Sequence, residues 1–248
     1  MTASANRLPI LQTVKEAVSL AASSFATAIS ITGLPLVGAL AAVAVGGFVG
    51  NAVLAVVTFI AFLLTLVCSI WAVMIVAQAK ALGIDLPTRP GALFLHSRFW
   101  KYGGASIATT FATLAISIPA ILFAALLFER MQGLAAAVMI VGLLLSFYVG
   151  LRLFLVLPAI AAGHPAPFEA SWRLTYGNTL AIACSLCLSL FPVWIVQSVT
   201  EELSKDSETA AAKIAGSIVV LLIAVVQAAV MGAVGGVAYR NLSAVQAD

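Results

Sequence analysis

Apolar runs long enough to cross a lipid bilayer recur along this chain, and they constrain its fold more than any motif does. A hydrocarbon layer about 30 Å thick needs roughly 20 helical residues, because each residue adds about 1.5 Å. Six segments reach this length, near 24–46, 52–79, 103–128, 133–157, 179–199 and 211–239. The sequence therefore predicts six transmembrane helices.

Composition excludes a soluble fold. Hydrophobic residues make up 63% of the 248 residues and charged residues only 8%, whereas soluble domains carry about 25% charged residues. In lipid, backbone hydrogen bonds must be satisfied within the protein, and helices do this within each segment. We expect an all-α integral membrane protein with a single transmembrane domain over 1–248. Lys15 and Glu16 interrupt what would be a signal-peptide core, so the first span should remain in the protein.

Charge bias predicts the orientation, because loops on the cytoplasmic side carry an excess of Lys and Arg. The basic residues assigned to one side are Arg7, Lys15, Lys80, Arg89, Arg98, Lys101, Arg152, Arg173 and Arg240. The other side has Arg130, Lys205 and Lys213 among the acidic residues Glu129, Glu201, Glu202, Asp206 and Glu208. We expect both termini in the cytoplasm and the chain in a bacterial inner membrane. The net charge of +3 arises from the basic residues predicted on the cytoplasmic side, so we do not expect nucleic acid as a partner.

A proline opens a short amphipathic stretch before each pair of spans, at Pro9, Pro90 and Pro167. Proline suits a first helical turn, where its missing N–H has no helical partner. We interpret the three stretches as helices on the inner membrane surface, each followed by a hairpin of two spans. The predicted repeats cover about 8–82, 88–158 and 165–242.

Prolines also fall inside the first span of each pair, at Pro35, Pro119 and Pro192, each shortly after a serine. Proline removes a backbone hydrogen bond and kinks a helix, and a nearby serine can satisfy the freed carbonyl. We expect helix kinks at these three positions. Two ladders of small residues at every fourth position predict close helix packing, most simply within the chain. They are Gly38, Ala42, Gly46 and Gly50, and Ala224, Ala228, Gly232 and Gly236.

The third amphipathic stretch has an aromatic face. Phe168, Trp172 and Tyr176 recur every four residues, with Arg173 beside them, and aromatic and basic residues together favour the headgroup zone. Arg152 lies at the predicted inner end of the fourth span, where its side chain can reach phosphate. We expect lipid-headgroup contacts at Arg152, Trp172, Arg173 and Tyr176. A specific ligand for Arg152 is the alternative to a structural or general lipid contact.

Residues that carry chemistry are scarce. No Asp, Glu or His falls inside a predicted span, and proton-coupled transporters usually need such groups. His164 has no partner at metal-ligand spacing, and His96 lies in a different context. We predict no catalytic residue, no metal site and no cofactor. Gln197 and Gln227 are the main large polar side chains within spans, and hydrogen bonding between helices would explain them.

The segment RLFLVLPAIAAGHPAPFEASWRLTYGN at 152–178 resembles a pattern in bacterial multispan membrane proteins of the YciC-like group. It is also similar to the membrane domain of certain glycerophosphoryl diester phosphodiesterases. The residues that carry the likeness are Arg152, Pro158, Ser171, Trp172, Leu174, Thr175, Gly177 and Asn178. The resemblance implies a multispan inner-membrane protein. Those phosphodiesterases place their catalysis on a separate soluble domain, so the likeness does not imply hydrolysis here.

Three classes of function compete. We favour a non-enzymatic accessory or scaffold component of the inner membrane that interacts with lipid and with other integral membrane proteins. The alternative is a facilitator or transporter for a lipid or small apolar solute, with a path between hairpins lined by the serine–proline kinks. A membrane-embedded enzyme is the least favoured class, because no nucleophile or phosphate-binding motif is present.

Overall fold

The computed structural model describes residues 8–48, 52–87, 90–205 and 210–247. All regular structure in these ranges is helical. The helices are α1 (Ile10–Phe48), α2 (Ala52–Leu82), α3 (Pro90–Leu95), α4 (Ser97–Phe128), α5 (Gln132–Leu153), α6 (Val156–Ala161), α7 (Pro167–Thr175), α8 (Thr179–Lys205) and α9 (Ala210–Ala247).

Five of the described helices are long and apolar enough to cross a membrane. The segments are Val56–Leu82, Ser97–Phe128, Gln132–Ala161, Thr179–Glu202 and Ile218–Ala244, and they correspond to the last five predicted spans. The first predicted span falls in α1, which is bent by 43° between Ile10–Thr27 and Ile29–Gly38. If both parts of α1 count as one span, the total is six. The prediction of an all-helical membrane protein is confirmed, and the sixth span stays a prediction.

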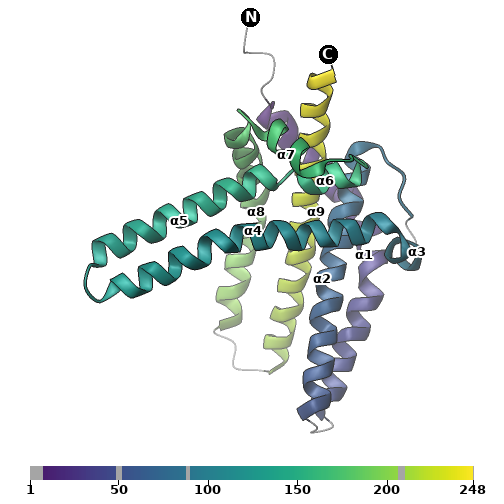
Figure 1. Cartoon of the computed structure of the whole chain (residues 1–248). Coiled ribbons are helices and arrows are strands. Elements are labelled where there is room, and N and C mark those ends of the chain that lie inside the picture. The colour runs from purple at the N-terminus through teal and green to yellow at the C-terminus, as the bar shows by residue number, and fades with distance from the viewer. Residues whose placement is uncertain (1–7, 49–51, 88–89, 206–209, 248) are drawn as a thin grey trace, which may run out of the picture.

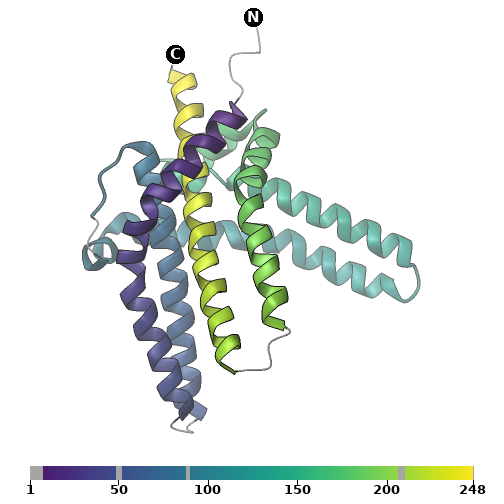
Figure 2. The same cartoon turned by 180° about the vertical axis from the view of Figure 1, so that it is seen from behind.

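Four long helices, α1, α2, α8 and α9, run side by side (Figures 1 and 2). The start of α1, the end of α2, the start of α8 and the end of α9 lie at one end of this four-helix unit, together with α6 and α7 (Figure 1). The end of α1, the start of α2, the end of α8 and the start of α9 lie at the other end. Helix α9 contacts α1, α2 and α8 and supplies more than half of the buried residues in the main apolar cluster of the unit.

Small residues explain why α9 can take this position. A Cβ atom on Gly232 would lie 2.7 Å from the carbonyl oxygen of Met74, and one on Gly236 would lie 2.6 Å from the Cβ of Ala81. Both neighbours belong to α2, so the glycines allow two helix backbones to approach closely. The prediction that this ladder serves contacts within the chain is confirmed. In the first ladder, Gly38 has no atom near its Cβ direction, and the side chains of its other three members lie outside the described residues.

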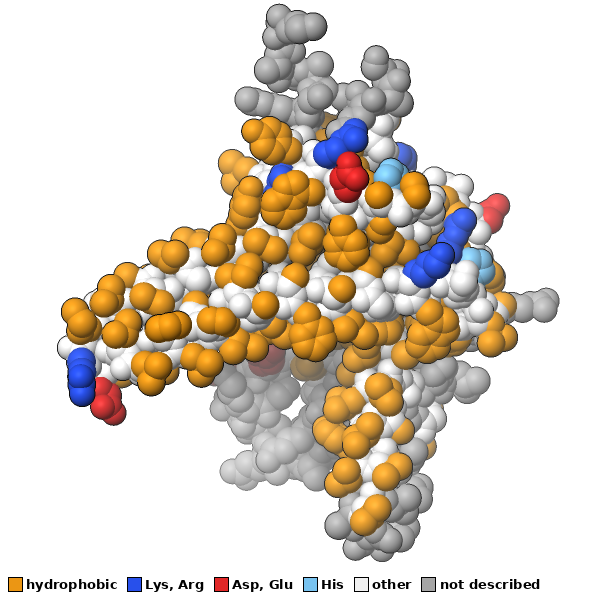
Figure 3. Space-filling model, viewed as in Figure 1, with side chains coloured by type: hydrophobic (Ala, Val, Ile, Leu, Met, Phe, Trp, Pro, Cys, Tyr) orange, Lys and Arg blue, Asp and Glu red, His pale blue; other side chains and the backbone are white. Residues whose placement is uncertain are grey.

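The α4–α5 pair points away from the four-helix unit, at a steep angle to its long helices (Figure 1). Its two helices pack on each other, with Gly142 directly against Ala120. Only 6% of the most apolar window of α4 is buried, against 50% for α9. Large apolar side chains therefore cover the outside of the pair, with Arg130 and Glu129 at the turn that joins the helices (Figure 3). The pair presents an apolar surface that this chain leaves uncovered.

The three proline-led stretches take three different forms. After Pro9 the helix α1 begins at once and continues into the long helix. After Pro90 a short α3 ends at Leu95, and α4 restarts at Ser97 because the His96 ring accepts a hydrogen bond from the Arg98 N–H. Only α7, which begins at Pro167, is a separate amphipathic helix. The threefold repeat stays a prediction, since the second pair of long helices is turned away from the others.

The proline positions differ in part from expectation. The bend in α1 falls between Thr27 and Ile29, ahead of Pro35, whose side chain lies outside the described residues. The helices α4 and α8 run through Pro119 and Pro192 as single helices, so kinks there stay a prediction.

The serines near these prolines do not satisfy the freed carbonyls, which would belong to Ala115 and Leu188 four residues before each proline. Ser117 instead donates to the Thr113 carbonyl, at 3.2 Å. The buried Ser189 hydroxyl has no partner among the described residues.

Candidate functional site

The polar features of the chain gather where α5, α6 and α7 meet, beside the four-helix unit. Helix α5 ends at Leu153, and the short α6 follows after one break in the helical geometry. The chain then turns at Gly163, whose φ of +80° is a conformation that glycine adopts without strain. Helix α7 runs back across the end of α5. The predicted turn between the fourth span and the amphipathic stretch is confirmed.

A hydroxyl group of α7 binds the end of α5. The last carbonyls of a helix have no partner within it. Ser171 donates to the Arg152 carbonyl at 2.7 Å. The Thr175 hydroxyl donates to the Ser171 carbonyl of its own helix at 2.7 Å and lies 3.4 Å from the Arg152 carbonyl. Both hydroxyl-bearing residues are fully buried. The Ser171 bond holds α7 against the end of α5.

The same contact encloses the Arg152 side chain in aromatic rings. Its guanidinium carbon lies 4.2 Å from the ring centre of Trp172, 5.6 Å from that of Tyr176 and 6.0 Å from that of Tyr148. Arg152 is only 3% exposed, and its Nε atom has no hydrogen-bond partner among the described residues. Ring faces attract a cation, most strongly when both are shielded from water. The three rings take the place of an acidic partner, and we call this arrangement the Arg152 cage.

The cage gathers three of the four residues expected to contact headgroups. Trp172 and Tyr176 are 45% and 79% exposed and form its outer wall. Arg152 lies beneath them, so it does not reach outward freely, as a side chain at the membrane surface would. Arg173 projects from a different face of α7. The headgroup role of these residues stays a prediction, with the two aromatic rings best placed to contact lipid.

Tyr148 was not among the predicted site residues. It precedes Arg152 by four positions in α5, so the two side chains share one helical face. This i,i+4 spacing of an aromatic residue and an arginine was the signal in the sequence. It was hidden because Tyr148 lies inside an apolar run, where an aromatic residue is usual.

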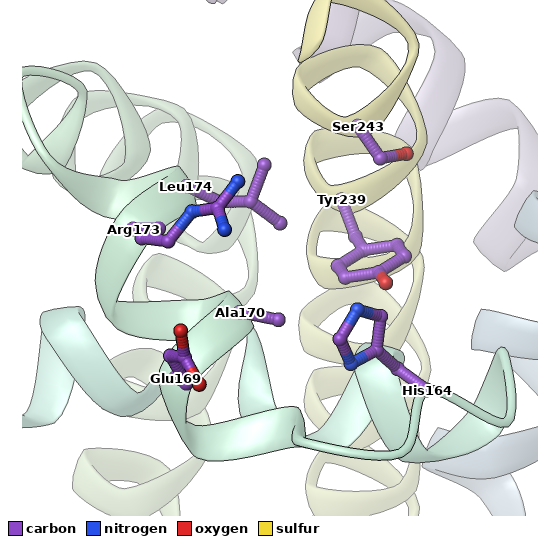
Figure 4. Close-up of a pocket in the computed structure, with 7 residues that line it drawn as sticks. All are labelled: His164, Glu169, Ala170, Arg173, Leu174, Tyr239 and Ser243. Atoms are coloured by element: carbon purple, nitrogen blue, oxygen red, sulfur yellow. The ribbon is translucent and has the colours of Figure 1, made fainter. Parts of the chain in front are cut away.

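A polar cavity of about 320 Å³ lies between α7 and the end of α9. Figure 4 shows His164 and Tyr239 with their rings close together, and Glu169 and Arg173 on the facing helix. Ala170, Leu174 and Ser243 complete the lining. Ser243 donates to the Arg240 carbonyl and the His164 Nδ1 atom accepts from the Ala166 N–H, so these two side chains are not paired as a nucleophile and its base.

The two histidines perform local structural roles. The Nδ1 atom of His164 accepts a hydrogen bond from the Ala166 N–H, and that of His96 accepts one from the Arg98 N–H. The fold does bring their regions together, because Ser97, Arg98 and His164 line one larger cavity of about 680 Å³. Within the described part of the chain, no group of three or more His, Cys, Asp or Glu could hold a metal ion.

Most residues of the 152–178 pattern serve the packing of this junction. Pro158 and Leu174 are buried, and a Cβ atom on Gly235 of α9 would lie 3.3 Å from the Pro158 ring. Asn178 accepts a hydrogen bond from the Leu8 N–H at 3.1 Å. The pattern therefore ties α5, α7 and α9 to the start of the chain.

Two further features lie within the four-helix unit. Gln227 of α9 donates to Gln197 of α8 at 2.7 Å, which confirms the predicted bond between helices. Gln197 in turn donates to Glu201 at 2.8 Å. An apolar cavity of about 380 Å³ lies between α1, α8 and α9, beside Ser189 and Pro192.

In comparisons with known proteins, no family model, no curated protein and no solved structure matched this chain.

Proposed function

We propose that this chain is a non-enzymatic accessory or scaffold component of a bacterial inner membrane, which contacts lipid and holds another integral membrane protein against its α4–α5 pair. The observation that carries the proposal is the exposed apolar surface of that pair. The most apolar window of α4 is only 6% buried by the rest of the chain, and apolar side chains cover most of the side of the pair that Figure 3 shows. Contiguous apolar surface of this kind serves interaction with lipid or with another protein.

The polar residues support a structural role for the other end of the molecule. The Arg152 cage and the Ser171 hydroxyl join α7 to α5, and the Asn178 bond joins the segment before α8 to the segment before α1. Arg240 of α9 similarly binds Glu16 of α1. A rigid junction of this kind would fix the direction in which the α4–α5 pair projects.

Photo-crosslinking in native membranes tests the proposal. A benzophenone amino acid replaces Phe123 of α4 in one variant and Phe191 of α8 in another, which are 63% and 60% exposed. We expect a discrete protein adduct from position 123 and only lipid adducts from position 191. The same adducts from both positions, or lipid adducts alone from position 123, would contradict the proposal.

The proposed orientation places both termini in the cytoplasm. Reporters inserted in EELSKDSE at 201–208 and in IDLPTRPG at 84–91 test it, because the first loop should be external and the second cytoplasmic. A cytoplasmic signal from the first loop would reverse the assignment.

One observation favours the alternative function, a facilitator for a lipid or small apolar solute. The apolar cavity beside Pro192 lies between three helices of the four-helix unit and is lined by Phe25, Val193 and Val226 among others. A fatty acid that carries a diazirine should label these residues if the cavity takes apolar solutes. Labelling confined to the α4–α5 pair would remove the support for this alternative.

A further inference from the structure

The larger cavity at the junction combines charge with an apolar wall. It has a volume of about 680 Å³ and lies between the start of α4, the end of α6 and the start of α7. Its lining is Ser97, Arg98, Lys101, Gly104, Ala105, Ala108, Ile160, Gly163, His164, Pro165, Pro167 and Phe168. Two of these residues are permanent cations, and none of the described lining residues is acidic. A cavity with this balance attracts an anion.

The Arg98 guanidinium is held in place but keeps most of its donors. It donates to the Ala161 carbonyl at the end of α6, at 3.5 Å, and lies over Gly163. A guanidinium has five N–H donors in a planar fork that matches phosphate oxygens. Its bond to the Ala161 carbonyl is long, so the other N–H donors of the guanidinium can bind phosphate oxygens. Lys101 is one turn further along α4, on the same side, and adds a second positive charge within reach of the same anion.

The lining of the cavity changes from polar to apolar along α4. Its polar part, Ser97 to Lys101, is followed by the small apolar residues Gly104, Ala105 and Ala108. Ten residues from 98 to 108 advance about 15 Å along a helix. The Cβ direction of Gly104 meets no atom within 4 Å, so this part of the wall is an open groove. Ile160 and Phe168 cover the opposite side. The groove accommodates a hydrocarbon chain that continues from an anionic head.

We propose that this cavity binds an anionic glycerophospholipid, with its phosphate on Arg98 and Lys101 and an acyl chain in the groove beside Gly104. The bound group is a phosphate diester, which both cations contact through charge-assisted hydrogen bonds. The site is separate from the Arg152 cage, where the guanidinium is covered by rings. Lipid binding at this site does not depend on the proposed accessory role, because it needs no partner protein on the α4–α5 pair.

Native mass spectrometry of the full chain in mild detergent tests the site by titration with phosphatidylglycerol and with phosphatidylcholine. The wild type should bind phosphatidylglycerol more tightly. The double variant Arg98→Gln/Lys101→Gln should lower that affinity by roughly tenfold, to the level of phosphatidylcholine. Lys15→Gln removes one charge from an exposed position at the same end of the molecule and should leave the preference intact. An unchanged preference in the double variant, or an equal loss in Lys15→Gln, would overturn the proposal.

A second pair of measurements separates a lipid from a soluble phosphate ester. Gly104→Leu adds a side chain whose Cβ position meets no atom within 4 Å and which extends into the groove, so it should weaken binding of both lipids while the protein stays folded. Inorganic phosphate and glycerol 3-phosphate should compete weakly. If either displaces phosphatidylglycerol at low concentration and Gly104→Leu has no effect, the ligand is a soluble phosphate and the lipid assignment is wrong.

Folding is checked by gel filtration and by thermal unfolding of each variant. Should the double variant fail to fold, Arg98→Lys and Lys101→Gln replace it. Arg98→Lys keeps the charge and loses the planar fork, so the preference for phosphatidylglycerol should fall only in part. Lys101→Gln alters an exposed residue and should lower the preference by severalfold. Wild-type preference in both variants would overturn the site.

Discussion

Helices α9 and α4 are almost equally apolar, yet the rest of the chain buries much of α9 and little of α4. Their most apolar windows have mean hydropathies of 2.6 and 2.4, while the buried shares are 50% and 6%. In α9, Gly232 and Gly236 allow the backbone of α2 to approach closely. In α4 the bulky side chains of Phe111, Leu122 and Phe123 face outward. Similar hydropathy thus accompanies two different environments: the glycines let α9 pack within this chain, and the bulky side chains of α4 remain outside its packing.

The largest effect should come from adding a methyl group where α9 meets α2. Gly232→Ala places a Cβ atom 2.7 Å from the Met74 carbonyl oxygen, and a backbone atom cannot rotate away. We expect a loss of about 2 kcal/mol in the free energy of unfolding, measured by unfolding in detergent. Gly133→Ala in α5 is the matched control, since its Cβ direction is open. Equal effects at both sites would contradict the contrast between the two regions.

Next in size is the junction that joins the two regions. Arg152→Gln removes a cation from three aromatic rings and should cost about 1–2 kcal/mol. Arg173→Gln, at an exposed position of α7, should cost much less. If the two changes destabilise the protein equally, the Arg152 cage does not hold α5 and α7 together.

The amino-acid sequence predicted every long helix of the described chain, because uninterrupted apolar runs leave the backbone few alternatives in lipid. It also singled out Trp172, Arg173 and Tyr176 from an aromatic spacing of four beside a basic residue, and Arg152 from its place at the inner end of a span. It did not predict that Arg152 lies among the aromatic rings. It did not predict the direction of the α4–α5 pair. That direction depends on contacts such as that of Ser171 with the Arg152 carbonyl. The apolar runs of α4 and α5 carry no pattern that specifies which helix each one should contact.

In the sequence, Arg98 and Lys101 belong only to the group of basic residues predicted on the cytoplasmic side of the membrane. Their three-residue spacing in α4 places both on one helical face. The cavity beside them depends on the return of the chain through α6 and α7, which no local pattern in the sequence specifies.

The smallest effect should come from the polar contact between α8 and α9. Gln227→Leu removes its bond to Gln197, which keeps Glu201 as a second partner. Side-chain hydrogen bonds between membrane helices contribute about 0.6 kcal/mol on average, so the loss should be near that value. A double-mutant cycle with Gln197→Leu measures the coupling directly. A coupling above about 2 kcal/mol would show that polar contacts, and not small residues, hold the four-helix unit together.

The most direct test of the central claim is the lipid exposure of the two regions in nanodiscs that hold one purified copy. Nitroxide labels at Phe111, Leu122 and Leu144 of the α4–α5 pair are compared with labels at Ala233 and Val237 of α9, by collision with dissolved oxygen. The three positions on the pair are exposed and the two on α9 are fully buried. We expect frequent collisions at all three positions of the pair and few at the two on α9. Equal protection of both regions would show that the chain covers its own α4–α5 surface, and would contradict the account.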